Sequence, residues 1–168
     1  ADVPIVGLEP AVKPACKNTR TGVVGVIATE RSLKSEKFLA TLAKYGQGVN
    51  VIKSVGQGFV EAVEANEEYS PQTEQTVRAV VEPIINKGAD VLVLGCTHYP
   101  FLRGVIAKVI GDRNVEIIDS GEAVEKRVES LLDEYDLRAE SGHKAEYEFV
   151  SFAADDYADR LRRKAFSR

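Results

Sequence analysis

The stretch Val91–Pro100, which reads VLVLGCTHYP, decides the fold of this chain. Its four leading aliphatic residues are too few for a helix and rich in valine, which predicts a buried parallel strand. Gly95 ends that strand, and Pro100 is suited to the first turn of the next helix. Cys96 is therefore predicted at the carboxyl end of a parallel strand and beside a helix N-terminus. In open α/β sheets this is the edge where ligands bind.

Two interpretations of Cys96 are open on local chemistry. A free cysteine most often behaves as a small buried hydrophobic residue. A helix N-terminus, however, carries free N–H groups and partial positive charge, which favour a thiolate and an anionic ligand. His98 follows two residues later, so in an extended backbone its side chain would share a face with that of Cys96. These neighbours favour a functional thiol.

Apolar segments of strand and helix length alternate along the rest of the chain. We expect strands at 3–7, 22–28, 49–55, 91–94, 115–118 and 147–152, and helices at 11–17, 29–46, 59–65, 70–88, 100–111, 121–135 and from 155 to the end. Pro83 should kink or divide the helix that contains it. The alternation predicts an α/β fold with a parallel, doubly wound sheet and helices on both faces.

Composition limits the classes of function. The 168 residues are 44% hydrophobic and 29% charged, which suits one globular domain, alone or with an appendage. A net charge of −4 without a dominant basic patch argues against a nucleic-acid partner. No apolar run reaches transmembrane length, so we expect a cytoplasmic protein without a membrane partner. Two cysteines far apart do not form a disulfide framework, and a reducing cytosol fits them.

Other polar residues lie where the predicted elements join. Thr29 follows a buried strand and precedes a helix, so it is either an N-cap or a hydroxyl donor to a carboxylate ligand. Glu61 and Glu64 share a short helix, where each would ordinarily face solvent and one could face the same cleft.

Four segments resemble one known family in chain order. Residues 95–102 (GCTHYPFL) resemble the second cysteine motif of the bacterial glutamate racemase family. Residues 3–10 (VPIVGLEP) resemble its entry into the second lobe, 25–29 (GVIAT) its substrate loop, and 118–122 (IDSGE) its return crossing.

The resemblance implies a fold, a reaction and roles for six residues. The family has two α/β lobes with the active site between them, and interconverts L- and D-glutamate without a cofactor or metal, supplying D-glutamate for peptidoglycan. Cys96 would be one of two catalytic cysteines. The resemblance implies that His98 and Glu64 assist it, and that Thr97, Thr29 and Ser32 bind substrate. We also expect a homodimer.

The family's first-lobe motifs are missing from this sequence. Its Asp-Ser pair, Tyr-Gly pair and first Cys-Asn-Thr motif do not occur, and Cys16 is not that first cysteine because Lys17 interrupts the motif. We therefore expect a C-terminal fragment that is inactive alone. Residues 1–8 would be a linker, 9–117 the second lobe, and 118–168 a segment that returns to the missing N-terminal lobe.

Two other classes of function compete with a racemase. Cys96 could be the nucleophile of a hydrolase with His98 as its base. Alternatively, the chain could be a module that binds a small dicarboxylate without turnover.

Overall fold

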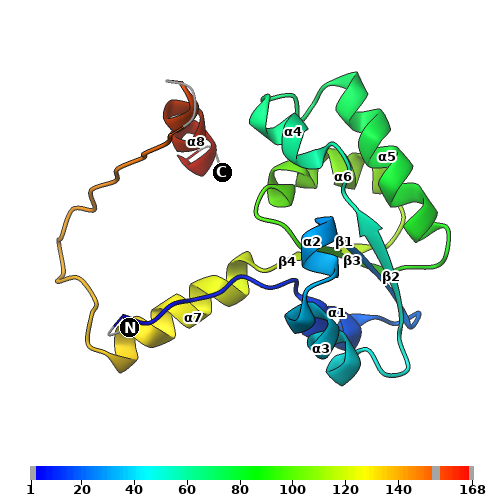
Figure 1. The fold of residues 1–168 in the computed structure, drawn as a ribbon, viewed down its shortest axis with the longest axis horizontal. Helices are drawn as coiled ribbons and strands as arrows, with labels where there is room; N and C mark the ends of the chain where they lie inside the picture. The colour runs from blue at the N-terminus through cyan, green and yellow to red at the C-terminus, as the bar shows by residue number, and fades with distance from the viewer. Residues whose placement is uncertain (1–2, 153–155, 167–168) are drawn as a thin grey trace. The chain divides into compact units, whose positions relative to one another are not determined.

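The computed structural model describes residues 3–152 and 156–166 (Figure 1). The chain divides into two compact units, Ala1–Leu131 and Leu132–Arg168.

The first unit is built on a four-stranded sheet in which every strand pair is parallel. The strands are β1 (Val23–Ala28), β2 (Asn50–Val55), β3 (Val91–Leu94) and β4 (Glu116–Asp119), in the order β2-β1-β3-β4. The short aliphatic strand β3 lies in the interior of the sheet and all four of its residues are buried. The predicted α/β fold with a parallel sheet is confirmed.

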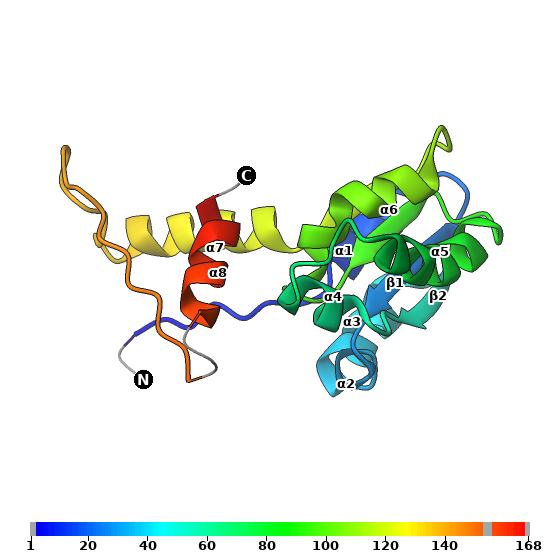
Figure 2. The ribbon, with the colours of Figure 1, turned by 90° about the horizontal axis from the view of Figure 1, so that it is seen from above.

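Helices cover both faces of this sheet (Figures 1 and 2). On one face α1 (Val12–Asn18) and α3 (Glu36–Tyr45) bury a core with alternate residues of β1 and β3. On the other face α4 (Phe59–Glu64), α5 (Pro71–Ile85), the 3-10 helix η1 (Tyr99–Leu102) and α6 (Arg103–Ile110) bury a larger core. Successive residues of β3 thus enter opposite cores, because strand side chains alternate between faces.

Local signals in the sequence set several helix ends. Ser70 caps α5 by accepting a hydrogen bond from the backbone N–H of Thr73 at 3.1 Å, and Pro71 occupies the first turn. Pro100 stands in the first turn of η1. These positions suit residues that satisfy, or lack, the free N–H groups of a helix start.

Two helix predictions are wrong in detail. Helix α5 is not divided at Pro83 but continues to Ile85, since the proline falls in the last turn; the expected kink stays a prediction. The single helix expected at 29–46 is two helices, α2 (Glu30–Leu33) and α3. Ser35 separates them by capping α3, with its hydroxyl accepting from the Phe38 N–H at 3.2 Å.

Two predicted strands are absent from the described residues. Residues 3–7 have no strand structure and lead into α1. Residues 147–152 alternate in polarity but also have none, because no partner strand is described for them. The aromatic rings of Tyr147 and Phe149 instead pack edge-on against Phe166, with ring centroids 5.0 and 6.0 Å from it.

The predicted C-terminal helices are present in the described residues. Helix α7 (Gly121–Glu134) begins in the first unit and ends in the second, and α8 spans Tyr157–Phe166. The predicted start of α8 at 155 and its end at 168 lie outside the described residues. The first compact unit ends at Leu131. The predicted boundary after residue 117 is of another kind, because it states which lobe of a larger protein residues 118–168 pack against. That boundary stays a prediction.

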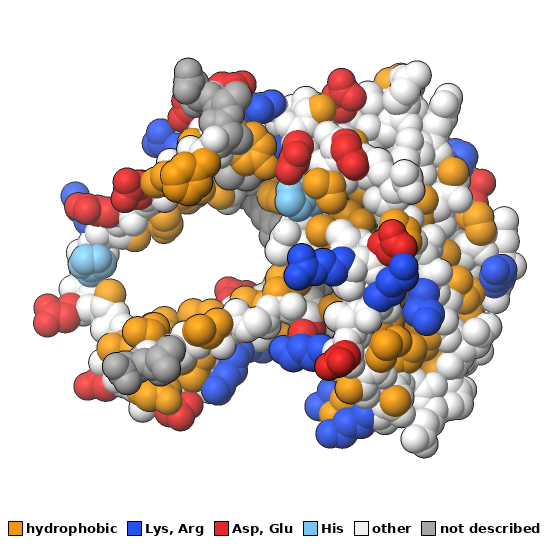
Figure 3. All heavy atoms as spheres, viewed as in Figure 1, with side chains coloured by type: hydrophobic (Ala, Val, Ile, Leu, Met, Phe, Trp, Pro, Cys, Tyr) orange, Lys and Arg blue, Asp and Glu red, His pale blue; other side chains and the backbone are white. Residues whose placement is uncertain are grey.

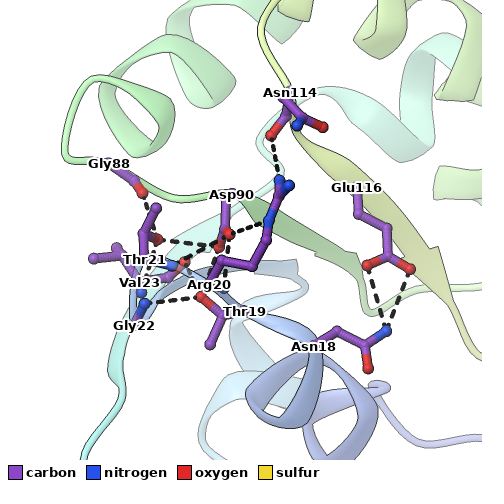
Figure 4. Close-up of polar contacts among 10 residues, drawn as sticks. All are labelled: Asn18, Thr19, Arg20, Thr21, Gly22, Val23, Gly88, Asp90, Asn114 and Glu116. Carbon is purple, nitrogen blue, oxygen red and sulfur yellow. Dashed lines mark hydrogen bonds and ion pairs between the residues drawn. The ribbon is translucent and has the colours of Figure 1, made fainter.

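A buried carboxylate closes the amino end of the sheet (Figure 4). Asp90 directly precedes β3 and is 6% exposed. It accepts hydrogen bonds from the Thr19 hydroxyl at 2.6 Å, the Arg20 N–H at 2.8 Å and the Thr21 hydroxyl at 3.0 Å. Burial alone would raise the pKa of Asp90, but these hydrogen bonds outweigh it and lower the pKa to about 2.

The surface carries both signs of charge. In the view of Figure 3, acidic and basic side chains are interspersed among apolar ones over the unit that contains the sheet. Within the described residues, none of the helices combines the length and the apolar character needed to cross a bilayer.

Candidate active site

Polar residues gather where β1, β2 and β3 end. Residues Ile27 and Leu94 are partners across the β1–β3 pairing, so Thr29 and Cys96 leave the sheet side by side. The loop after β2 joins the same edge, because the N–H of Gly56 donates to the carbonyl of Ala28 at 3.2 Å. The carboxyl edge of the sheet therefore presents the three loops on which the sequence placed its candidates.

Gly95 is required for this arrangement. Its N–H donates to the carbonyl of Ile27 at 2.8 Å, which extends the ladder by one residue. A Cβ at this position would lie 2.9 Å from the Cβ of Ala28 and 3.1 Å from the ring of Pro10. A side chain at 95 would thus push apart the strand ends that support Cys96.

The backbone from Cys96 to Tyr99 is a turn. His98 is helical, with φ −80° and ψ −31°, and the N–H of Tyr99 donates to the carbonyl of Cys96 at 3.2 Å. The expectation that Cys96 and His98 share a face of an extended strand is therefore wrong. The turn arises because the helix η1 already begins at Tyr99, with Pro100 in its first turn.

The imidazole of His98 lies between two of the other predicted residues. Its Nε2 is 3.4 Å from Oε1 of Glu64, at the end of α4, and its Nδ1 is 3.4 Å from the hydroxyl of Thr97. Of the two glutamates on α4, Glu64 is thus the one beside His98. Glu61 lies near Tyr99 instead, where its charge helps to raise the pKa of that phenol.

Thr29 and Ser32 form a second polar pair at the same sheet edge. Thr29 caps α2 by accepting from the Ser32 N–H at 3.2 Å, and the two hydroxyl oxygens are 2.8 Å apart. The capping role of Thr29 is therefore present. Its role as a hydroxyl donor to a substrate carboxylate stays a prediction.

The two cysteines lie against different cores. Cys96 is half-buried and packs against the core under α4, α5 and α6, whereas Cys16 packs against the core under α1 and α3. Burial raises the pKa of the Cys16 thiol, which disfavours its reactive thiolate. A packed thiol with a raised pKa suits a structural or incidental role for Cys16.

Sequence reasoning missed Tyr99. The side chain is 1% exposed, and its hydroxyl donates to the carbonyl of Gly56 at 3.3 Å. Burial, followed by the charges of Cys96 and Glu61, raises the pKa of Tyr99 far above its usual range. The sequence contains one indication of its importance, which is the position of this tyrosine inside the cysteine motif, between the polar residues Thr97 and His98 and Pro100.

The described residues offer sulfur, imidazole, carboxylate and hydroxyl groups at this edge. Nowhere in the described ranges do three or more His, Cys, Asp or Glu side chains cluster with the spacing of a metal site. The arrangement combines a half-buried thiol, a carboxylate–imidazole pair and two hydroxyl groups at the end of the neighbouring strand.

The sequence matches the family model described as Asp/Glu/Hydantoin racemase over residues 1–127, so the chain belongs to this family. Among curated relatives, it is 48% identical over 139 residues to the glutamate racemase of Pseudomonas entomophila, covering 83% of this chain and 52% of that protein. It is 41% identical over 159 residues to the glutamate racemase of Pseudomonas aeruginosa, covering 95% and 59%.

A solved structure has the same fold. The Escherichia coli glutamate racemase, in complex with L-glutamate and the activator UDP-MurNAc-Ala, matches with a TM-score of 0.78 at 27% identity. The match covers 96% of this chain and 60% of that one. The chain thus spans little more than half the length of the relatives it matches.

Proposed function

We propose that this chain is the second lobe of a glutamate racemase, which interconverts L- and D-glutamate by moving a proton at Cα without a cofactor. The observation that carries the proposal is the motif Cys96-Thr97-His98 at the carboxyl end of β3, with Glu64 3.4 Å from His98. The named relatives and the glutamate-bound Escherichia coli structure support glutamate as substrate.

The chemistry requires two acid–base groups. The Cα proton of an amino acid is only weakly acidic, and a thiolate is a base that a positive neighbour can favour. Inversion needs one group to remove the proton from one face of Cα while another returns a proton to the opposite face. In this proposal Cys96 serves one face, with the His98–Glu64 pair beside it, and a cysteine on a first lobe serves the other.

The same reasoning concerns the 168-residue chain by itself. It holds half of the proposed cleft and one of the two proton-transfer groups, so we expect it to bind glutamate weakly and to lack turnover. Segment 118–168 is proposed to pack on the first lobe. The resemblance further suggests a cytosolic homodimer that supplies D-glutamate for peptidoglycan.

A cysteine hydrolase is less well supported. Among the described residues no hydrogen bond joins the Cys96 thiol to the His98 ring, whose two nitrogens face Glu64 and Thr97. A hydrolase with this pair would need the base within reach of the nucleophile.

The test is exchange of the α-proton in D₂O. The longer protein that contains both lobes should convert L-glutamate to D-glutamate with deuterium at Cα. Cys96→Ser should abolish the conversion of L-glutamate to D-glutamate, and the matched change Cys16→Ser should leave that conversion intact. Near-normal racemisation by a folded Cys96→Ser protein would remove Cys96 from the mechanism.

A further inference from the structure

Tyr99 connects the cysteine turn to the loop after β2 from inside the core. Its ring meets Phe59, the first residue of α4, edge-on, with centroids 5.1 Å apart and planes at 71°. Its hydroxyl donates to the carbonyl of Gly56, which also accepts from the N–H of Phe59 at 3.2 Å. The carbonyl oxygen of Gly56 therefore accepts two hydrogen bonds. One comes from the first residue of α4, and the other comes from Tyr99 at the end of the turn 96–99, called the cysteine turn here.

Gly56 and the ring of Tyr99 are in close contact, with no space for a side chain at position 56. A Cβ on Gly56 would lie 2.6 Å from both the hydroxyl oxygen and the ring carbon Cζ of Tyr99. Such a separation is far below van der Waals contact, so residue 56 and the tyrosine ring determine each other's position. The contact fixes where α4 begins relative to Cys96.

The other end of α4 carries Glu64. The helix contains six residues, so its two ends are roughly 8 Å apart along the axis. A helix this short moves as one rigid piece, and a shift at Phe59 is passed to Glu64. His98 precedes Tyr99 in the chain, so the same tyrosine also limits where the imidazole can lie.

We propose that Tyr99 is a positioning residue, which acts through Gly56 and Phe59 to keep the Glu64 carboxylate beside His98. This inference rests on the proposed function. It assigns a task to a side chain that is itself too deeply buried to contact substrate. The raised pKa of the phenol keeps it a hydrogen-bond donor at any pH at which the protein works.

A double-mutant cycle tests the proposal in the longer protein. Tyr99→Phe removes the hydroxyl and keeps the ring, so it should lower kcat for α-proton exchange about tenfold and change KM less than about twofold. In a Glu64→Gln background, Tyr99→Phe should lower kcat by less than about twofold, because the Glu64–His98 pair that Tyr99 positions is already lost. Phe38→Leu, in the core on the opposite face of the sheet, is the control for lost stability and should leave kcat unchanged.

A second readout does not depend on turnover. In the 168-residue chain, Tyr99→Phe should shift the imidazole NMR resonances of His98 in the direction that Glu64→Gln shifts them, and Phe38→Leu should not. Unmoved His98 resonances, or equal losses of kcat with and without Glu64, would overturn the positioning role. A wild-type protein that shows the Tyr99-dependent resonances but no exchange would overturn the proposed function instead.

Discussion

The carboxylate of Asp90 should make the stability of this chain depend on pH. Its pKa is lowered from 3.8 to about 2 by the hydrogen bonds of Thr19, Arg20 and Thr21. At about 1.36 kcal/mol per pKa unit, the ionised carboxylate stabilises the folded chain by about 2 kcal/mol at neutral pH. Because the folded pKa lies below the unfolded one, this stabilisation is present above about pH 5 and is lost as the pH falls toward 2.

The substitution Asp90→Asn removes the charge and turns an amide toward backbone donors. At pH 7 it should lower the free energy of unfolding by about 3 kcal/mol, since the part-buried N–H groups of Arg20 and Thr21 lose a charged acceptor. At pH 3 the wild-type chain has already lost about 1 kcal/mol of the carboxylate's contribution, so the difference should shrink by that amount.

Urea denaturation followed by circular dichroism at pH 7 and pH 3 measures both differences. Glu116→Gln is the matched control, because Glu116 lies near the same end of the sheet but meets Asn18 on the exposed surface, at 3.3 Å. Its cost should stay below about 0.5 kcal/mol. An Asp90→Asn cost that is the same at both pH values would refute the reasoning from the lowered pKa.

Three further predictions concern single side chains. Ser70→Ala removes the cap of α5 and should destabilise the chain by about 1 kcal/mol in urea denaturation, with an unchanged m-value. Gly25→Ala would place a Cβ 2.4 Å from Ile84 and should cost about 1–3 kcal/mol, whereas Gly7→Ala, which meets a single atom at 3.6 Å, should cost little; equal costs would contradict the packing argument. In a Cys96→Ser chain, the Cys16 thiol should react with a disulfide reagent more slowly than an unstructured cysteine peptide at pH 8, because burial raises its pKa; an equal rate would contradict this.

The sheet and most helix starts could be predicted because their signals are local. The aliphatic run at 91–94, the cap and proline at Ser70 and Pro71, and the glycine after β3 each act within a few residues. The strand expected at 147–152 failed for a non-local reason. Alternating polarity is compatible with a strand, but a strand also needs a neighbour to bond with.

The sequence indicates which residues could form the candidate site, but not how they are arranged in space. The motif identified Cys96, Thr97 and His98, but the turn that directs His98 toward Glu64 depends on contacts between α4 and the cysteine turn. Tyr99 and Asp90 escaped notice because their partners lie 43 and about 70 positions away in sequence. A short segment of the sequence never contains both residues of such a contact, so local patterns cannot reveal it.

Asp90 and Cys96 lie at opposite ends of β3, a strand of four residues that is roughly 13 Å long. A substitution at Asp90 should therefore lower the fraction of molecules that are folded. It should leave unchanged the activity proposed for each folded molecule. In a cell it would appear as low abundance, through chaperones and proteases, and growth at a lower temperature would relieve it. If Cys96 has the proton-transfer role proposed above, its loss would leave abundance normal, and no change of temperature would restore activity.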